Sequence, residues 1–302
     1  MEKKTLTVFT PAYNRGYIIH KCYESLCRQT SKDFVWLVVD DGSTDNTAEL
    51  VKEWQKQDNG FEIKYIYKEN GGMHTAHNTA YENIDTELNV CIDSDDYMPD
   101  DAVEIILDEW KKYRENEKYG GMVALDVDSK NFNVIGTELD ETIKNFNLDY
   151  YYNHGGLGDK KLIYRTDVIK KYPQYPVFEG EKYVSLAYKY RLIGKDYFLG
   201  VINKPVCVVE YQENGSSMNM YRQYLNNPKG FAFIRKINMQ YIDDKKRNFI
   251  DCIHYVSSSI ISKNKSFVKE SPKKLMTVLA VPFGLLLTVI IRIKAKKLMK
   301  VK

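Results

Sequence analysis

Leu88-Asn89-Val90-Cys91-Ile92, followed at once by Asp93-Ser94-Asp95-Asp96, is the stretch that decides the fold. The apolar run has the length of a buried strand, and the acidic run comes directly after it. Ionised carboxylates this close repel one another and are costly to desolvate, so the cluster favours a bound cation. Oxygen ligands suit Mg²⁺ or Mn²⁺, which usually completes its coordination with water and nucleotide phosphates. The stretch therefore predicts a strand that ends at a metal and nucleotide site.

Strands and helices alternate upstream of this stretch. Apolar runs of strand length cover residues 5–10, 34–39 and 62–67. Segments with helical spacing follow them at residues 17–29, 47–57 and 73–84. This alternation predicts a parallel sheet with right-handed crossovers, whose ligands bind at the carboxyl ends of the strands. The polar clusters lie at those ends, in residues 10–15, 40–45, 70–78 and 93–96.

The rest of the chain continues as a second half and a tail. A helix is predicted over residues 101–115, and strands return over 120–136. We expect residues 1–220 to form one α/β domain, with nucleotide binding in 1–100 and the acceptor and catalytic half in 101–220. Residues 221–302 are expected to form a C-terminal helical region.

Charge is distributed unevenly along the 302 residues. The net charge is +3, but residues 263–302 hold 11 Lys/Arg and one acid, which leaves residues 1–262 with a balance of −7. A mildly acidic body argues against nucleic acid as a partner, since nucleic-acid binding needs a basic face. Five cysteines without metal spacing and an N-terminus without an apolar core predict a reduced, cytosolic chain.

Three motifs together carry a family resemblance. They are Thr10-Pro11-Ala12-Tyr13-Asn14-Arg15, Val39-Asp40-Asp41-Gly42-Ser43-Thr44-Asp45 and Asp93-Ser94-Asp95-Asp96. In this order, each after a predicted strand, they resemble the GT-A glycosyltransferases of family 2, of the bacterial capsule and exopolysaccharide type. The resemblance implies a Rossmann-like, mostly parallel sheet flanked by helices. It also implies an inverting, metal-dependent transfer of a sugar from a nucleotide-sugar donor.

The resemblance assigns donor-site roles residue by residue. Thr10, Pro11, Tyr13 and Arg15 would line the base and phosphate end of the site, and Asp40 or Asp41 would accept a hydrogen bond from uracil. Asp93 and Ser94 would face the donor, and Asp93 and Asp95 would hold Mn²⁺ or Mg²⁺. Taken alone, the segment 40–45 also suits a turn and a helix cap, because Asp, Gly and Ser favour both.

His77 departs from the common family pattern, which has an arginine at this position. A neutral imidazole donates one hydrogen bond, against five from guanidinium. Two interpretations stay open for His77: contact with the donor phosphates, or simple packing within a helix.

The predicted general base lies in Phe178-Glu179-Gly180-Glu181-Lys182-Tyr183-Val184. This segment resembles the one that supplies the family's base, with Glu181 as the best match and Glu179 in reserve. Inverting transfer needs such a group to deprotonate the acceptor hydroxyl. Some relatives add a histidine to the metal shell after residue 210; here water or Glu210 would take its place.

The tail predicts association with a membrane surface. Residues 275–291 carry no charge but reach only about 25 Å as a helix, short of a bilayer core of roughly 30 Å. Pro282 and Gly284 are expected to interrupt the run. Basic residues on both sides favour an anionic surface, so the segment 273–302 is expected to lie on the membrane rather than span it.

Together these observations predict transfer from a UDP-sugar to a lipid-linked saccharide at the cytoplasmic face of a bacterial inner membrane. Two alternatives remain. A sugar nucleotidyltransferase would need a glycine-rich loop after the first strand, where this chain has a single glycine. A non-catalytic nucleotide- or glycan-binding protein would not need the acidic cluster or Glu181.

Overall fold

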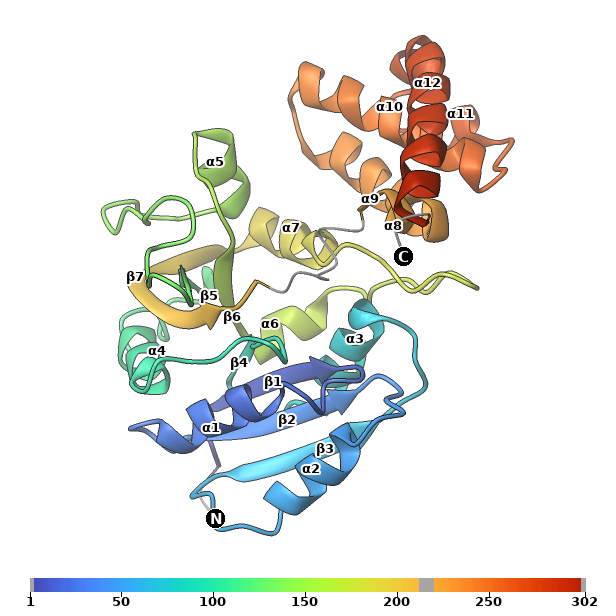
Figure 1. The fold of residues 1–302 in the computed structure, drawn as a ribbon. Helices are drawn as coiled ribbons and strands as arrows, with labels where there is room; N and C mark the ends of the chain where they lie inside the picture. Colours follow the sequence, from blue (N-terminus) through green and yellow to red (C-terminus); the bar gives the residue numbers. More distant parts are fainter. Residues whose placement is uncertain (1–2, 212–219, 300–302) are drawn as a thin grey trace. The chain divides into compact units, whose positions relative to one another are not determined.

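The computed structural model describes residues 3–211 and 220–299. These residues fall into two compact units, one drawn from positions 1–174 and 189–212 and the other from 175–188 and 213–302. The segment 175–188 therefore leaves the first unit, joins the second and returns. Figure 1 labels the elements of both units.

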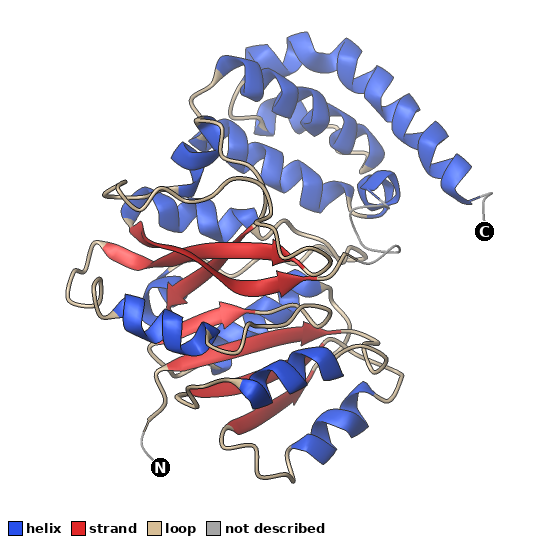
Figure 2. Ribbon diagram, turned by 60° about the vertical axis from the view of Figure 1, so that its left-hand side comes forward, coloured by secondary structure: helices blue, strands red, loops and turns tan. Residues whose placement is uncertain are grey.

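A seven-stranded sheet with the order β3-β2-β1-β4-β6-β5-β7 forms the centre of the first unit (Figures 1 and 2). The strands are β1 (Leu6–Ala12), β2 (Phe34–Asp40), β3 (Glu62–Tyr67), β4 (Leu88–Cys91), β5 (Tyr119–Asp128), β6 (Lys160–Arg165) and β7 (Phe198–Val209). Only β6 among these strands runs antiparallel to its neighbours. This arrangement confirms the predicted mixed, mostly parallel α/β sheet.

Helices cover both faces of this sheet. They are α1 (His20–Arg28), α2 (Thr47–Trp54), α3 (Met73–Asn83), α4 (Ala102–Trp110), α6 (Thr166–Lys171) and α7 (Ala187–Asp196). The short helix α5 (Leu148–Asn153), between β5 and β6 in the chain, buries none of its residues. Side chains alternate along a strand, so β1 presents Leu6 and Val8 to a core shared with α1, α2 and α4. The opposite face presents Phe9, whose ring meets His77 and Tyr81 of α3 edge-on.

Strand β1 continues through Pro11, where the sequence predicted a stop. Pro11 pairs with Val39 of β2, but the pairing of β1 with β4 ends at Phe9. Beyond Phe9 the β4 side of β1 has no strand partner, and a residue without an N–H is tolerated at such an edge. The extra residues carry Tyr13 and Arg15 further along the same edge of the sheet.

The second unit is helical. Its helices are α8 (Met220–Asn226), α9 (Pro228–Tyr241), α10 (Lys245–Ile261), α11 (Phe267–Glu270) and α12 (Lys274–Met299). α10 and α12 approach closely, because a Cβ on Gly284 would lie 2.4 Å from Cγ1 of Val256. The hydroxyl of Thr288 donates to that of Ser257 at 3.0 Å in the same contact. Small side chains on α12 thus set the distance between the two helices.

Helix α12 runs without interruption through Pro282, so the predicted break is wrong. A proline removes one helical hydrogen bond, and the packing of the following turns on α10 holds the helix together. Its 26 residues reach about 39 Å, and it is the helix among the described residues that is long and apolar enough to cross a membrane. Only 28% of its apolar window is buried. Nine apolar side chains, between 38% and 76% exposed, form its outer stripe: Leu275, Val278, Leu279, Phe283, Leu285, Leu286, Val289, Ile290 and Ile293.

Candidate active site

The loops after β1 and β2 are hydrogen-bonded to each other. The Asn14 amide donates to Oγ of Ser43 at 2.9 Å, and the Thr44 amide donates to Oδ1 of Asn14 at 2.8 Å. Asn14 adopts a left-handed conformation, with φ 52°, which asparagine tolerates better than most residues. These bonds fix the two loops as one rim at the carboxyl ends of the strands.

The carboxylates of Asp40 and Asp41 hold the loops of this rim by accepting hydrogen bonds from them. Asp40 is fully buried; its carboxylate accepts the Ser43 amide at 2.7 Å and the Tyr65 hydroxyl at 2.6 Å. Asp41 is also buried, and its oxygens accept the amides of residues 71 and 72, the Lys68 ammonium at 2.5 Å and the Asn70 side chain. The geometry supports the turn-forming role that the sequence allowed. Recognition of uracil by either carboxylate stays a prediction.

Gly42 is required where this rim meets the loop after β3. Its φ is +83°, and a Cβ there would lie 2.7 Å from the Asn70 amide nitrogen. An L side chain would therefore clash with backbone in a conformation that it rarely adopts. The close approach lets Asp41 reach the glycines that precede α3.

The other residues predicted at the base and phosphate end differ in accessibility. Thr10 and Pro11 are buried, and the Thr10 hydroxyl accepts the Trp36 indole N–H at 3.0 Å inside the core. Tyr13 is 48% exposed, and the half-buried Arg15 lies close enough to Asp95 to oppose the rise that burial causes in that carboxyl's pKa. Tyr13 and Arg15 are therefore accessible, and their contact with a donor stays a prediction, whereas Thr10 is packed in the core.

His77 is fully buried on the inner side of α3. Its Nδ1 lies 3.1 Å from the Tyr81 hydroxyl and its Nε2 lies 3.6 Å from Sγ of Cys91. Burial lowers the pKa of His77 to about 3, so the ring is neutral at physiological pH. This environment favours the packing interpretation, and contact with donor phosphates stays a prediction.

The four residues of the acidic run after β4 differ in burial. Asp93 and Asp95 are half-buried, whereas Ser94 and Asp96 are buried. Burial, with help from Asp93, raises the pKa of the Asp95 carboxyl above its ordinary value, and Arg15 opposes the shift. Asp96 accepts the Glu210 amide at 3.1 Å and thereby ties the loop to the end of β7. Asp93 and Asp95 are thus the more accessible acids of the run.

Sequence reasoning missed the cation that neutralises Asp96. The Lys161 ammonium on β6 lies 4.0 Å from carboxylate oxygens of both Asp96 and Asp126. Asp126 is 2% exposed, and its Oδ1 has no hydrogen-bond partner among the described residues. Burial raises the pKa of Asp126 to about 6. The sequence did contain a signal for this cation. Asp126 stands inside the apolar run 122–127, and a buried carboxylate needs a positively charged partner.

The donor atoms at the rim suit a hard divalent cation. Among the described residues, no three His, Cys, Asp or Glu side chains are grouped as a complete metal site. Asp93 and Asp95 offer two carboxylates; burial raises the pKa of Asp95 most, and Asp93 adds to the rise with negative charge that a cation would relieve. Mg²⁺ commonly binds one or two carboxylates and takes its other ligands from water and phosphates. The residues present therefore fit Mn²⁺ or Mg²⁺ bound together with a diphosphate.

Glu181 belongs to the second unit, whereas the acidic run belongs to the first. Its two carboxylate oxygens accept the amides of Lys229 and Gly230, each at 2.9 Å, at the start of α9. It is 9% exposed, whereas Glu179 is exposed to solvent. A carboxylate offers about four lone-pair sites, so two bonds orient Glu181 and leave sites for a further donor.

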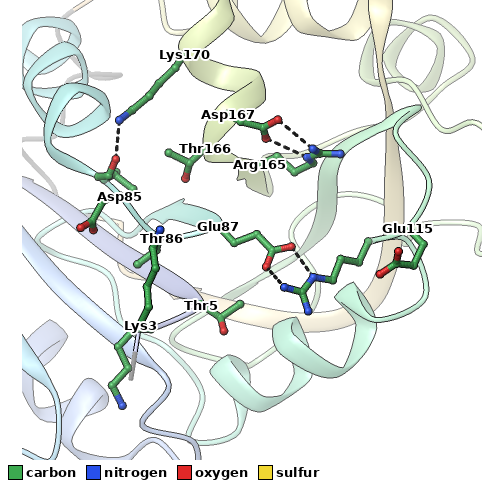
Figure 3. Close-up of a pocket in the computed structure, with 13 residues that line it drawn as sticks. Lys3, Thr5, Asp85, Thr86, Glu87, Glu115, Arg165, Thr166, Asp167 and Lys170 are labelled. Carbon is green, nitrogen blue, oxygen red and sulfur yellow. Dashed lines mark hydrogen bonds and ion pairs between the residues drawn. The ribbon is translucent and has the colours of Figure 1, made fainter. Parts of the chain in front are cut away.

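A cavity of about 690 Å³ lies at the amino ends of β1 and β4, at the end of these strands away from the rim. Figure 3 shows the residues that line it. It is lined by residues that precede β1 and β4, including Thr5 and Thr86, and by Arg165 at the end of β6. Its charges are largely self-paired: Arg165 forms two hydrogen bonds with Asp167. None of the predicted site residues lines it.

Comparison with known proteins identifies the family. The sequence model of the family described as "Glycosyl transferase family 2" matches residues 7–171, more than half of the chain. Glycosyltransferase GlyA of Streptococcus pneumoniae is 37% identical over 109 residues, which cover 36% of this chain and 15% of that protein. Chondroitin synthase of Escherichia coli is 36% identical over 107 residues, which cover 35% of this chain and 15% of that protein. The chain thus matches only a small part of these relatives.

Solved structures support the fold. Staphylococcus aureus TarS 1–349 in complex with UDP-GlcNAc has a TM-score of 0.62 at 18% identity, covering 91% of this chain and 79% of that one. The mannosyltransferase PcManGT from Pyrobaculum calidifontis, in complex with GDP-Man and Mn²⁺, has a TM-score of 0.54 at 17% identity, covering 98% of this chain and 84% of that one. These similarities confirm the predicted GT-A fold class. The match over residues 7–171 shows that the chain belongs to glycosyl transferase family 2.

Proposed function

We propose that this chain transfers a sugar from a UDP-sugar to a hydroxyl of a lipid-linked saccharide, with inversion, in bacterial cell-surface polysaccharide synthesis. The observation that carries the proposal is the rim at the carboxyl ends of β1, β2 and β4, where Arg15 lies near Asp95 in the acidic run that also holds Asp93. Similar structures contain UDP-GlcNAc, UDP and GDP-Man, which supports a nucleotide-sugar donor.

The residues at the rim have distinct parts in this proposal. Asp93 and Asp95 would hold Mn²⁺ or Mg²⁺, which when bound neutralises charge that grows on the leaving diphosphate. Arg15 adds a second positive charge on the phosphate side. Tyr13, the exposed aromatic side chain at the end of β1, offers a flat surface for the nucleobase.

Glu181 is the proposed general base, with Glu179 in reserve. The amides of α9 hold the Glu181 carboxylate in one orientation, as a base that must meet a hydroxyl at a defined angle requires. Glu179 is exposed on the same turn, and no backbone amide among the described residues holds its carboxylate in this way.

Helix α12 supports the membrane part of the proposal. Its outer stripe is apolar along the whole helix, while Lys273, Lys274 and Arg292 provide basic charge near both ends. The length and apolarity of α12 also meet the requirements of a membrane span. We propose the interfacial position, with the outer stripe in the acyl boundary, because basic residues near both ends suit anionic headgroups. We place the protein at the cytoplasmic face of the inner membrane, where a lipid-linked acceptor is within reach.

Calorimetric titration with UDP, GDP and CDP, each with and without Mn²⁺, tests the donor assignment. We expect Mn²⁺-dependent binding of UDP, and its loss in Asp95→Ala. Binding of UDP by Asp95→Ala at wild-type affinity would contradict the metal assignment, and failure of all three nucleotides would favour a non-catalytic protein.

Transfer assays then test the base. We expect Glu181→Gln to bind UDP normally and to lose transfer, with Glu179→Gln as the matched control that retains it. The reverse pattern would move the base to Glu179.

A further inference from the structure

A groove of about 290 Å³ lies in the second unit, on the side of α9 that carries Lys229, Phe233 and Lys236. These positions are four and three residues apart, so they share one face of the helix. Phe178 closes one side, with its ring 6.1 Å from that of Phe233. Ala232 and Tyr255 also line the groove.

The far end of the groove is polar. Asn264 donates to Oε2 of Glu270 at 3.1 Å, and the Lys236 ammonium lies 3.5 Å from the same oxygen. By contrast, the Lys229 ammonium has no acidic partner within ion-pair distance in the part of the chain that the structure describes. The groove thus combines aromatic walls, a neutralised hydrogen-bonding end and one unpaired cation.

One turn joins the groove to the proposed base. The Glu181 amide donates to the Phe178 carbonyl at 2.9 Å, and Gly180 between them has φ +77°. Phe178 therefore faces the groove from the same turn that sends Glu181 to the amide of Lys229. Two residues that line the groove, Phe178 and Lys229, are thus hydrogen-bonded to Glu181 within the same unit.

We propose that this groove binds an anionic sugar unit of the acceptor, with its negative group at Lys229. Pyranose rings present apolar C–H faces that pack on aromatic side chains, and their hydroxyls would meet Asn264 and Glu270. The volume is below the roughly 300–1,000 Å³ of sites for drug-sized ligands, which suits a single sugar ring rather than a nucleotide. The acceptor role rests on the proposed function, whereas binding itself does not.

The test uses the full-length protein and three probes in ligand-observed NMR titrations: methyl glucuronide, glucose 6-phosphate and methyl glucoside. We expect at least one anionic sugar to bind roughly tenfold more tightly than the neutral one, because a charged hydrogen bond is stronger than a neutral one. The carboxylate and phosphate probes show which anion the groove prefers. Equal binding of all three probes, or no binding, would overturn the proposal.

Lys229→Met is the diagnostic variant, and Lys246→Met, an exposed lysine on α10, is its matched control. We expect Lys229→Met to lose the preference for the anionic sugar and Lys246→Met to keep it, with both unfolding at the wild-type temperature. An unchanged preference in Lys229→Met would also refute the site. Mn²⁺-dependent UDP binding, measured on the same samples, separates the two hypotheses. If UDP does not bind but the anionic sugar still does, the proposed transfer reaction is contradicted and the proposed sugar site is retained.

Discussion

Glutamate in place of both Leu279 and Leu286 should detach the protein from anionic membranes without unfolding it. Each of these leucines is 60% exposed on the outer stripe of α12. Full burial of a leucine contributes about 1.5–3 kcal/mol, so the exposed part of each offers about 1–2 kcal/mol to a bilayer. Each added acid also costs about 1 kcal/mol near a negative surface. Together the changes amount to at least about 4 kcal/mol, or roughly a thousandfold in partitioning.

Sedimentation with vesicles of phosphatidylglycerol and phosphatidylethanolamine measures this loss, and urea unfolding in lipid-free buffer measures stability. We expect stability within about 0.5 kcal/mol of wild type, as is usual for exposed positions. Leu157→Glu, at a leucine 62% exposed in the first unit, is the control and should bind vesicles normally. Wild-type vesicle binding by the double variant would refute the reasoning, as would marked destabilisation in buffer, because the stripe would then be packed against protein.

Three further predictions concern the first unit. Asp126 has a pKa raised to about 6, so its contribution to stability is present below about pH 4 and is lost as pH rises through 6. Urea unfolding of Asp126→Asn from pH 4 to 7.5 should therefore show the variant gaining up to about 3 kcal/mol relative to wild type, and parallel curves would contradict this. Gly42→Ala should lower the free energy of unfolding by about 1–3 kcal/mol and weaken UDP binding at least tenfold, because the new Cβ would clash with Asn70. Unchanged stability and binding would show that the loops can shift to accommodate the methyl group. His77→Phe should keep wild-type UDP affinity by calorimetry if His77 only packs, and a large loss would restore its contact with the donor.

The order of strands and helices in the first hundred residues was predictable because it depends on local patterns. Apolar runs of strand length alternate with helical spacing, and each observed strand lies within two residues of its predicted position. The passage of β1 through Pro11 was not predictable in this way. It depends on where β4 stops pairing, which is a property of the sheet rather than of residues 5–12.

The acidic run was located correctly, but the division of work inside it was not predictable. The separation of Asp96 from Asp93 and Asp95 follows from Lys161, which is 65 positions away in sequence and on the antiparallel strand β6. Likewise, the amides that orient Glu181 come from residues 229 and 230. Spacing within a motif cannot reveal partners that the chain brings in from another element.

Residues 175–188 belong to the second unit although the chain on both sides belongs to the first, and this limits how the protein can be divided into fragments. The main chain passes between the two units at three places, near residues 174, 188 and 212. An expression fragment that ends near residue 220 keeps the excursion but loses α9, and with it the amides that hold Glu181. The C-terminal helices are therefore not a detachable module. Any shuffling of this region between related genes must exchange two separate stretches of coding sequence together.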